Sequence, residues 1–478
     1  MGQEIGKAEF TESDFDTFHQ KLRNETKLLM KWFNDGVLDQ EGGVCGSEVE
    51  AWLTDENFLP MPGNVEFLKK TKHSQIVPEI AQFNFEINGE PQTIDSDVLS
   101  RTHRDLSECW TISREAAQSL NSNSIMIGSL PTLRDEMLSM EYISPLKRYF
   151  ALNERVLEMR KSEPLHLKID GIDHLEVTHS NVMMECAATS LQVHLQVEPS
   201  RAKDYYNASQ MLAGPMIAMS ANSPYLFGKD LWAETRIPLF EQAVNVPSFR
   251  GRHSEPIGRV TFGTRFLRES LFELFLENLD GYATLLPLVT DDDSEWLSHL
   301  RLHNGTIWRW NRPIVGISNL GKPHLRIEHR VIASGPTMTD IVANIAFYLG
   351  AVHYYADHMD ALLRNVKFEN VRRDFYNCAK NGLGAQISWM GQESSSVHQI
   401  LLNEILPNAK SALKNIGVSS VDLATYFDNT LRPRLLNGQN GATWQRSFIA
   451  THGTDFQALT EQYMINQNSG NSVHDWKV

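Results

Sequence analysis

The amino-acid sequence predicts an α+β fold with a mostly antiparallel sheet, and three observations lead to this class. Short segments in roughly the first two-thirds of the chain alternate apolar and polar residues, as strands with one buried face do. Helical patterns lie between them without the regular strand–helix alternation of a doubly wound parallel sheet. After Gly335-Pro336-Thr337 the pattern is almost wholly helical to about Tyr463.

Period-two alternation locates the strands. In Ser190–Val197 every second residue from Leu191 onward is apolar, and the residues between are polar. Successive side chains of a strand point to opposite faces, so this segment has one face for the core and one polar face. The same reasoning predicts strands at Val44–Leu53, Gln82–Asn88, Thr306–Arg312 and Leu325–Val331, and a hairpin of Leu165–Ile169 with His174–Val177.

Apolar residues at helical spacing predict the helices, which are Thr11–Asp35, Ser96–Ser122, Ser200–Met211, Lys229–Val244, Phe266–Leu279 and Asp340–Leu363. Ser96 is a candidate N-cap, because its hydroxyl can accept a hydrogen bond from an amide at the helix start. Asp340–Leu363 is expected to be the longest helix. The polar end Asn466–Val478 is expected to be loose.

Composition excludes several classes of protein. Of the 478 residues, 41% are hydrophobic and 22% charged, as in folded globular proteins. The net charge of −15 and the lack of a basic stripe argue against a nucleic-acid partner. The N-terminus has no signal peptide and Ile341–Ala356 is too short to span a bilayer, so we expect a cytoplasmic protein without a membrane segment. No CxxC pair occurs, which argues against a disulfide framework or zinc site at Cys45, Cys109, Cys186 or Cys378.

Four predicted strands carry functional side chains on their polar faces. Residues two apart point to one side of a strand, so Glu48 and Glu50 share a face. The other strands offer Asn84 with Glu86, then Gln192 with His194 and Gln196, then Arg326 with Glu328 and Arg330, while Glu79 precedes the second. Neighbouring buried carboxylates have raised pKa values unless cations compensate. If the strands share one sheet, they form a floor suited to Mg²⁺ and anionic substrates.

A solvated face is the ordinary alternative for each of these strands. Glu, His and Arg on four strands, in place of Ser, Thr and Lys, argue against it, although salt-bridged surface ladders stay open. Gly316–Lys322 spells GxxxxGK, but Pro323 stands where a phosphate-binding loop has Ser or Thr, and a strand follows. A P-loop is therefore not predicted.

Several short motifs occur in order between about residues 44 and 350. They are Gly46-Ser-Glu48-Val-Glu50, Pro78-Glu79 with Gln82–Glu86, Thr189-Ser-Leu-Gln192-Val-His194, Ala221-Asn222-Ser223-Pro224 followed by Arg236, Thr306-Ile-Trp308-Arg309-Trp-Asn311-Arg312-Pro313, and Arg326-Ile-Glu328-His-Arg330 with Ser334-Gly335-Pro336-Thr337 and Asp340. In this order they resemble the type 2 glutamate–cysteine ligases and their carboxylate–amine ligase relatives. Residues 365–478 match no specific motif.

The resemblance implies a glutamine-synthetase-like catalytic region over residues 1–364, with residues 365–478 as a helical region packed on the same unit. It implies that ATP activates the γ-carboxylate of glutamate as a γ-glutamyl phosphate, which an amine then attacks. Cysteine is the favoured amine, as in the first step of glutathione synthesis. The implied cofactors are ATP and Mg²⁺, with Mn²⁺ as the alternative ion, and a homo-oligomer is left open.

The resemblance and the residue chemistry together assign roles. The expected metal ligands are Glu48, Glu50, Glu79, Glu86, His194 and Glu328. The expected substrate contacts are Asn222, Arg236, Arg312 and Arg330, the expected nucleotide contacts are Gln192 and Arg326, and Glu328 and Arg330 are expected to be catalytic. A nitrogen ligand is unusual for Mg²⁺, so His194 has the alternative role of orienting a carboxylate. Arg309, on the opposite strand face, has a structural role as its alternative.

Three alternative functions stay open. The first is the same chemistry with a different amine. The second is a non-catalytic nucleotide-binding relative, against which the acidic residues argue. The third is a metal-dependent hydrolase of phosphate esters, because carboxylate clusters also serve two-metal sites.

Overall fold

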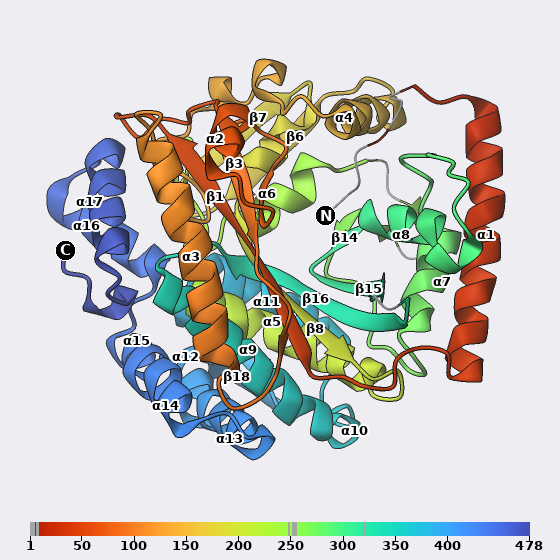
Figure 1. Ribbon diagram of the computed structural model, residues 1–478. Helices are drawn as coiled ribbons and strands as arrows, with labels where there is room; N and C mark the ends of the chain where they lie inside the picture. Colours follow the sequence, from red (N-terminus) through yellow and green to blue (C-terminus); the bar gives the residue numbers. More distant parts are fainter. Residues whose placement is uncertain (1–4, 6–8, 247–248, 251–255, 319–320) are drawn as a thin grey trace.

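A large antiparallel sheet crosses the middle of the molecule (Figure 1). The computed structural model describes residues 5, 9–246, 249–250, 256–318 and 321–478. Within them, the strands of this sheet are β1 (Val44–Thr54), β2 (Ile76–Pro78), β3 (Asn84–Asn88), β4 (Gln92–Thr93), β5 (Asn123–Ile125), β8 (Ser190–Val197), β15 (Asn311–Ile317) and β16 (Pro323–Ala333). The order is β15-β16-β8-β1-β3-β2, and β4 and β5 also pair with β1. Every neighbour runs antiparallel, which confirms the predicted α+β class.

Smaller strand pairs lie outside this sheet. They are β6 (Leu165–Asp170) with β7 (His174–His179), β9 (Tyr225–Leu226) with β10 (Lys229–Asp230), β11 (Phe249–Arg250) with β12 (Pro256–Ile257), β13 (Val260–Thr261) with β14 (Trp308–Arg309), and β17 (Gln386–Trp389) with β18 (Gln392–Ser396). The pair β6–β7 is the predicted hairpin. Pro323 begins the strand β16, which agrees with the prediction that Gly316–Lys322 is followed by a strand and is not a P-loop. Residues 319–320 of that segment lie outside the described residues.

The helices surround the sheet. They are α1 (Glu12–Asp35), α2 (Asn64–Thr71), α3 (Val98–Gln118), α4 (Lys147–Met159), α5 (Ala202–Ser220), α6 (Arg236–Ala243), α7 (Phe272–Gly281), α8 (Ser298–Gly305), α9 (Met338–Asp357), α10 (Met359–Leu362), α11 (Phe368–Asn381), α12 (Val397–Ile400), α13 (Leu406–Ile416), α14 (Ser420–Leu423), α15 (Arg432–Asn437), α16 (Gly441–His452) and α17 (Phe456–Ser469). Among the described helices, none is both long and apolar enough to cross a membrane.

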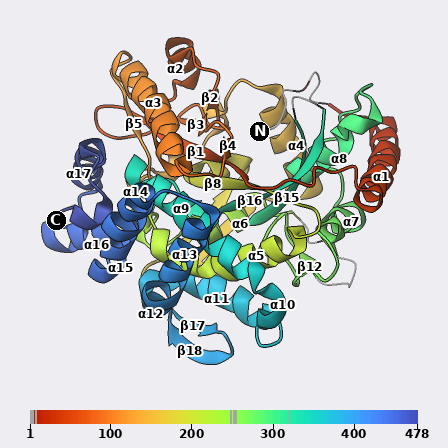
Figure 2. The same cartoon turned by 60° about the horizontal axis from the view of Figure 1, so that its bottom comes forward.

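The apolar face of the sheet packs on α5 and α9. Leu191, Val193 and Leu195 of β8 are buried in one core cluster with the residues of these helices. Figure 2 shows α5, α9 and α11 beneath the strands β8 and β16. Because α5 lies between the sheet and other helices, nearly all of its residues are buried, and a helix in that position is apolar all round. The candidate site lies on the opposite, polar face of the sheet.

The first helix follows its sequence signals closely. Thr11 accepts a hydrogen bond from the Asp14 amide, and the Asp14 carboxylate accepts one from the Thr11 amide. This reciprocal cap fixes the helix start. Gly36 ends the helix with a φ of 69°, a conformation that glycine adopts without strain.

Several helix predictions are wrong in their bounds. The first turn of α3 is preceded by Asp97, so Ser96 is not the N-cap. The helix predicted to end at Met211 continues through Pro215 to Ser220, because burial on all sides outweighs the hydrogen bond that proline removes. Where Lys229–Val244 was expected to be helical, a strand precedes the short helix α6, and α7 begins only at Phe272.

The rear third also differs from the prediction. The α9 helix has 20 residues and α1 has 24, so the predicted helix from Asp340 is not the longest. The hairpin β17–β18 interrupts the helical region. The end of the chain is not loose, because Val473 and Trp476 are buried and Trp444 Nε1 donates to the Lys477 carbonyl at 3.1 Å. Helix α11 packs on α5 and α13 on α9, across the residue-364 boundary, and the division there stays a prediction.

Arg309 holds β14 to α7 from a fully buried position, in agreement with a structural role. Its guanidinium donates to Glu277 Oε1 and to Asn278 Oδ1, both at 2.5 Å. We expect Arg309→Ala to lower the free energy of unfolding by about 3–5 kcal/mol, because Glu277 would keep a buried charge without its partner. Urea denaturation measures this change. The exposed Arg268→Ala serves as the control and should alter stability by less than about 0.5 kcal/mol. A loss below about 1 kcal/mol for Arg309→Ala would contradict the role.

Candidate active site

The sheet register brings the polar faces of four strands together. Across β16 and β8, Glu328 lies opposite His194. Across β1 and β3, Glu50 lies opposite Glu86, and across β1 and β8, Glu48 lies opposite Gln192. Residues paired in this way point to the same side of a sheet. The predicted floor of carboxylates around one imidazole is therefore present.

Three of the predicted metal ligands form a tight group. His194 Nε2 lies 3.2 Å from Glu48 Oε1 and 3.6 Å from Glu328 Oε1. One ligand atom from each residue can be chosen so that all three lie within 4.8 Å of one another. The Glu328 side chain is only 1% exposed and that of His194 only 8%. Two acidic side chains so close together in the interior require positive charge nearby.

The local charges shift both carboxylates of this group. Burial alone would raise the pKa of Glu48, but the imidazole of His194 holds it at about 2. Burial likewise opposes ionisation of Glu328, yet the guanidinium groups of Arg312 and Arg330 bring its pKa well below the usual range. The surrounding positive charge thus favours the ionised form of both carboxylates.

A second set of carboxylates has shifts in the opposite direction. Burial raises the pKa of Glu79 to about 7, and the charge of Glu50 adds to this effect. Burial and the charge of Glu48 raise the pKa of Glu86 well above its usual range. Burial also raises the pKa of Glu50, against the nearby Arg330 and Arg236. This part of the site has more negative charge than its protein neighbours neutralise.

The donor set fits a divalent cation. Neither ring nitrogen of His194 has a hydrogen bond of good geometry, and Glu86 Oε1 is buried without a partner among the described residues. Carboxylate oxygens are the ligands that Mg²⁺ prefers. Glu328 Oε1 also accepts from Arg312, and a carboxylate oxygen has a second lone pair for another partner. A cation at this face would bind the acceptors that lack partners and would stabilise the ionised form of the carboxylates whose pKa values are raised.

Two of the predicted arginines contact the acidic group. Arg312 forms a bidentate pair with Glu328, in which Nε donates to Oε2 at 2.6 Å and Nη2 donates to Oε1 at 2.8 Å. Arg330 Nη1 lies 3.2 Å from Glu328 Oε2 and also donates to Gln192 Oε1. Gln192 in turn donates to Glu50 Oε1 at 2.9 Å. Arg312 and Gln192 are thus largely engaged by protein groups, and their contacts to substrate and nucleotide stay predictions.

The remaining predicted contacts lie in different settings. Arg326 shares the face of Glu328, and its buried Nε has no hydrogen bond to a described residue. Arg236 is 4% exposed, and its side-chain hydrogen bonds to described residues are long, such as 3.4 Å to Glu234. Asn222 is fully buried, and its amide donates to the Ser334 carbonyl at 2.7 Å and to the Tyr463 hydroxyl at 2.8 Å. Asn222 is thus part of a buried hydrogen-bond network, and its contact to substrate stays a prediction.

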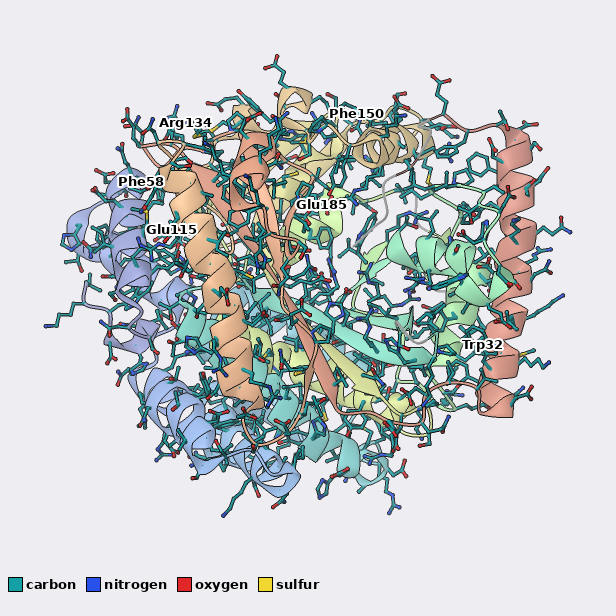
Figure 3. The ribbon with its side chains drawn as sticks, in the orientation of Figure 1. Trp32, Phe58, Glu115, Arg134, Phe150 and Glu185 are labelled. Atoms are coloured by element: carbon teal, nitrogen blue, oxygen red, sulfur yellow. The ribbon has the colours of Figure 1, made fainter. Side chains whose placement is uncertain are left out.

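A cavity opens beside the floor, with a volume of about 540 Å³ including the solvent at its mouth. Predicted residues on its wall are Glu50, Glu79, Arg236 and Arg330. Sequence reasoning missed others, namely Glu185, Cys186, Phe240 and Trp310. Glu185 lies in a short 3-10 helix, Val182–Ala187, and Figure 3 shows it inside the molecule, unlike Phe150 at the rim. A lone acid within the apolar run Val182–Ala188 was the available signal.

The cysteines agree with the predicted absence of disulfides. All four are buried and free. Burial raises the pKa of the Cys45 thiol to about 12, which disfavours the reactive thiolate. Cys186 lines the cavity, and burial also raises its pKa well above the usual range.

Comparison with solved structures identifies the fold. The glutamate–cysteine ligase of Francisella tularensis, solved in complex with AMP, superposes with a TM-score of 0.56 at 10% sequence identity, covering 90% of each chain. A bifunctional glutathione synthetase from Pasteurella multocida gives a TM-score of 0.52 at 13% identity, covering 94% of this chain and 55% of that one. These likenesses show that the chain has the fold of these two ligases.

Comparison at the level of sequence is more specific. No curated protein sequence matches this chain. The model of glutamate–cysteine ligase family 2 matches residues 44–448, which include every predicted site residue. Since that match covers most of the 478 residues, the chain belongs to glutamate–cysteine ligase family 2.

Proposed function

We propose that this protein joins the γ-carboxylate of glutamate to an amine, with cysteine as the favoured amine, and converts ATP to ADP and phosphate. Family membership supports ATP-dependent carboxylate–amine ligation as the class of reaction. The observation that carries the proposal is the Glu48–His194–Glu328 group beside a cavity with Arg236 and Arg330 on its wall. Carboxylates for a cation and arginines for anions are what phosphoryl transfer to a carboxylate needs.

The proposed reaction has two steps. A carboxylate is a poor electrophile, so a γ-carboxylate oxygen first attacks the γ-phosphorus of ATP, forming one P–O bond while the bond to ADP breaks. The amine nitrogen then attacks the carbonyl carbon, a C–N bond forms, phosphate leaves and the nitrogen loses a proton. The complex of the Francisella ligase with AMP supports a nucleotide site in this fold.

The residues of the floor suggest how the chain assists these steps. Glu48, Glu328 and His194 would hold a Mg²⁺ ion, with Glu50, Glu79 and Glu86 as further carboxylates beside it; a bound Mg²⁺ neutralises charge on phosphate oxygens. Arg330 and Arg236 orient the anionic substrate, because a guanidinium binds a carboxylate or a phosphate through two donors. The buried walls of the cavity exclude water from the acyl phosphate, which would otherwise hydrolyse.

The decisive experiment follows the products of the reaction. We expect the purified chain, with magnesium, ATP and glutamate, to release ADP and phosphate only when an amine is added, and to form γ-glutamylcysteine by mass with cysteine. A screen of other amines tests the first alternative. Phosphate release without glutamate would favour a hydrolase. Nucleotide binding without turnover would favour a non-catalytic relative. Release of AMP and pyrophosphate would contradict the acyl-phosphate mechanism. The cytoplasmic location belongs to this proposal as well.

A further inference from the structure

Three charged residues of the cavity wall each have a buried side-chain atom without a hydrogen-bond partner among the described residues. Glu185 Oε2 on one part of the wall is buried without a partner among the described residues. The Nε atoms of Arg236 and Arg330, from two other elements, are also buried without a partner among the described residues. Such atoms are rare in folded proteins, and each one calls for an explanation. Because these side chains of opposite charge line one cavity, a single ligand with a cationic and an anionic end would compensate both charges.

Other carboxylates of the cavity are less suited to a new cationic partner. Both oxygens of Glu50 already accept hydrogen bonds, from the Ser190 amide at 2.6 Å and from Gln192 at 2.9 Å. Glu79 belongs to the set beside the predicted metal site, and its Oε2 accepts from the Ile80 amide at 3.2 Å. Glu185 is therefore the acid of this wall that has an oxygen without a partner among the described residues and no proposed metal role.

The backbone of Glu185 is firmly placed. The Asn181 side chain accepts from the Met183 amide at 2.9 Å at the start of its 3-10 helix. The next contact joins this helix to α4, where Asn153 Oδ1 accepts from the Val182 amide at 3.0 Å. The same helix packs on α6, which supplies Arg236 and Phe240. A recognition group held by such supports keeps its position relative to the arginines.

We infer that Glu185 accepts the α-ammonium group of glutamate while Arg236 and Arg330 receive its α-carboxylate, so that this cavity selects an α-amino acid over a plain dicarboxylate. The inference rests on the proposed function and goes beyond it by naming the group that Glu185 recognises. The electrostatics are consistent with it, since burial raises the pKa of Glu185 to about 8 and the charges of Glu79 and Glu50 act in the same direction. An ammonium group would compensate that buried charge, and Phe240 and Trp310 offer apolar walls for the methylene groups.

The test compares L-glutamate with glutarate, which has both carboxylates and lacks the amino group. Binding of each to the full chain with magnesium is measured by calorimetry. We expect the wild type to prefer glutamate by at least about 10-fold, and Glu185→Gln to weaken glutamate binding by about 10- to 100-fold while glutarate binding stays within about twofold. Glu404→Gln is the matched control, because this carboxylate accepts from Tyr355 and Trp389 outside the cavity. It should leave the preference unchanged.

The possible results separate this inference from the proposed function. An unchanged glutamate preference in a folded Glu185→Gln protein would overturn the inference, as would a wild type that does not distinguish glutamate from glutarate. A loss of cysteine affinity alone would assign the ammonium to the amine substrate and overturn the inference too. If Glu185→Gln melts early, Glu185→Asp keeps the charge and should show a smaller preference for glutamate. The proposed function fails separately, if the wild type releases no ADP with glutamate and an amine.

Discussion

Replacing Glu328 with glutamine is expected to lower kcat by about 100- to 1,000-fold, the effect of removing one preorganised charged group from an active site. Glu328 is the member of the floor with the most partners. It accepts from both arms of Arg312, lies 3.2 Å from Arg330 and 3.6 Å from His194. The amide has no charge and cannot accept at both ends, so the two arginines would lose their shared partner.

The magnesium dependence should change with the rate. If Glu328 is a ligand, Glu328→Gln should raise the magnesium concentration for half-maximal ADP release by at least about 10-fold. Glu328→Asp retains the charge but withdraws it by one methylene, so it should fold and still lose activity. Glu176→Gln, exposed on the β6–β7 hairpin, is the control. A folded Glu328→Gln protein with the wild-type rate and magnesium dependence would contradict the metal site.

Much of the floor could be predicted because alternate residues of a strand point to opposite faces, so the polar and apolar faces are visible in the sequence. The predicted bounds of β8 agree with the structure at both ends, and the alternation there already separates the core residues from Gln192 and His194. A one-residue shift in pairing would move all polar residues to the other face. The apolar face, packed on α5 and α9, excludes that shift, so the polar sides of neighbouring strands must meet.

The cavity could not be predicted in the same way. Glu185 lies in a short 3-10 helix, where no period assigns a face, and only the packing of that helix on α6 brings it to the arginines. The contacts of Arg312 depend on its rotamer, which the strand pattern does not determine. Asn222 lies in a motif of the family, but its position inside the network with Ser334 and Tyr463 depends on contacts with the distant helix α17.

The missed hairpin β17–β18 has a local signal that the helical surroundings obscured. Met390 and Gly391 both have positive φ, 50° and 82°, as a two-residue hairpin turn requires. The glycine is visible in the sequence, whereas a methionine in that conformation is uncommon. Before the turn, the apolar residues Ile387 and Trp389 alternate with Gln386 and Ser388, so a period-two pattern was visible in the first strand.

Replacing Arg330 with lysine should lower kcat/KM for glutamate by roughly 10- to 150-fold, which corresponds to the 1.5–3 kcal/mol of a hydrogen bond to a charged group. Lysine keeps the positive charge that depresses the pKa of Glu328, but it lacks the planar fork. In the native side chain Nη1 contacts Glu328 and Gln192, while Nε has no hydrogen-bond partner in the described part of the chain. A single ammonium group cannot hold both protein partners and also reach a substrate.

The two kinetic constants distinguish where Arg330 acts. A contact to the α-carboxylate exists in the ground state and should appear mainly as a higher KM for glutamate, whereas a contact formed only in the transition state should lower kcat. We expect the rise in KM to dominate, because Arg330 lines the cavity together with Arg236. Arg301→Lys, an exposed arginine on α8, provides the matched control and should leave both constants unchanged. Normal turnover of Arg330→Lys at low glutamate concentration would remove Arg330 from the substrate contacts and leave it as a partner of Glu328 alone.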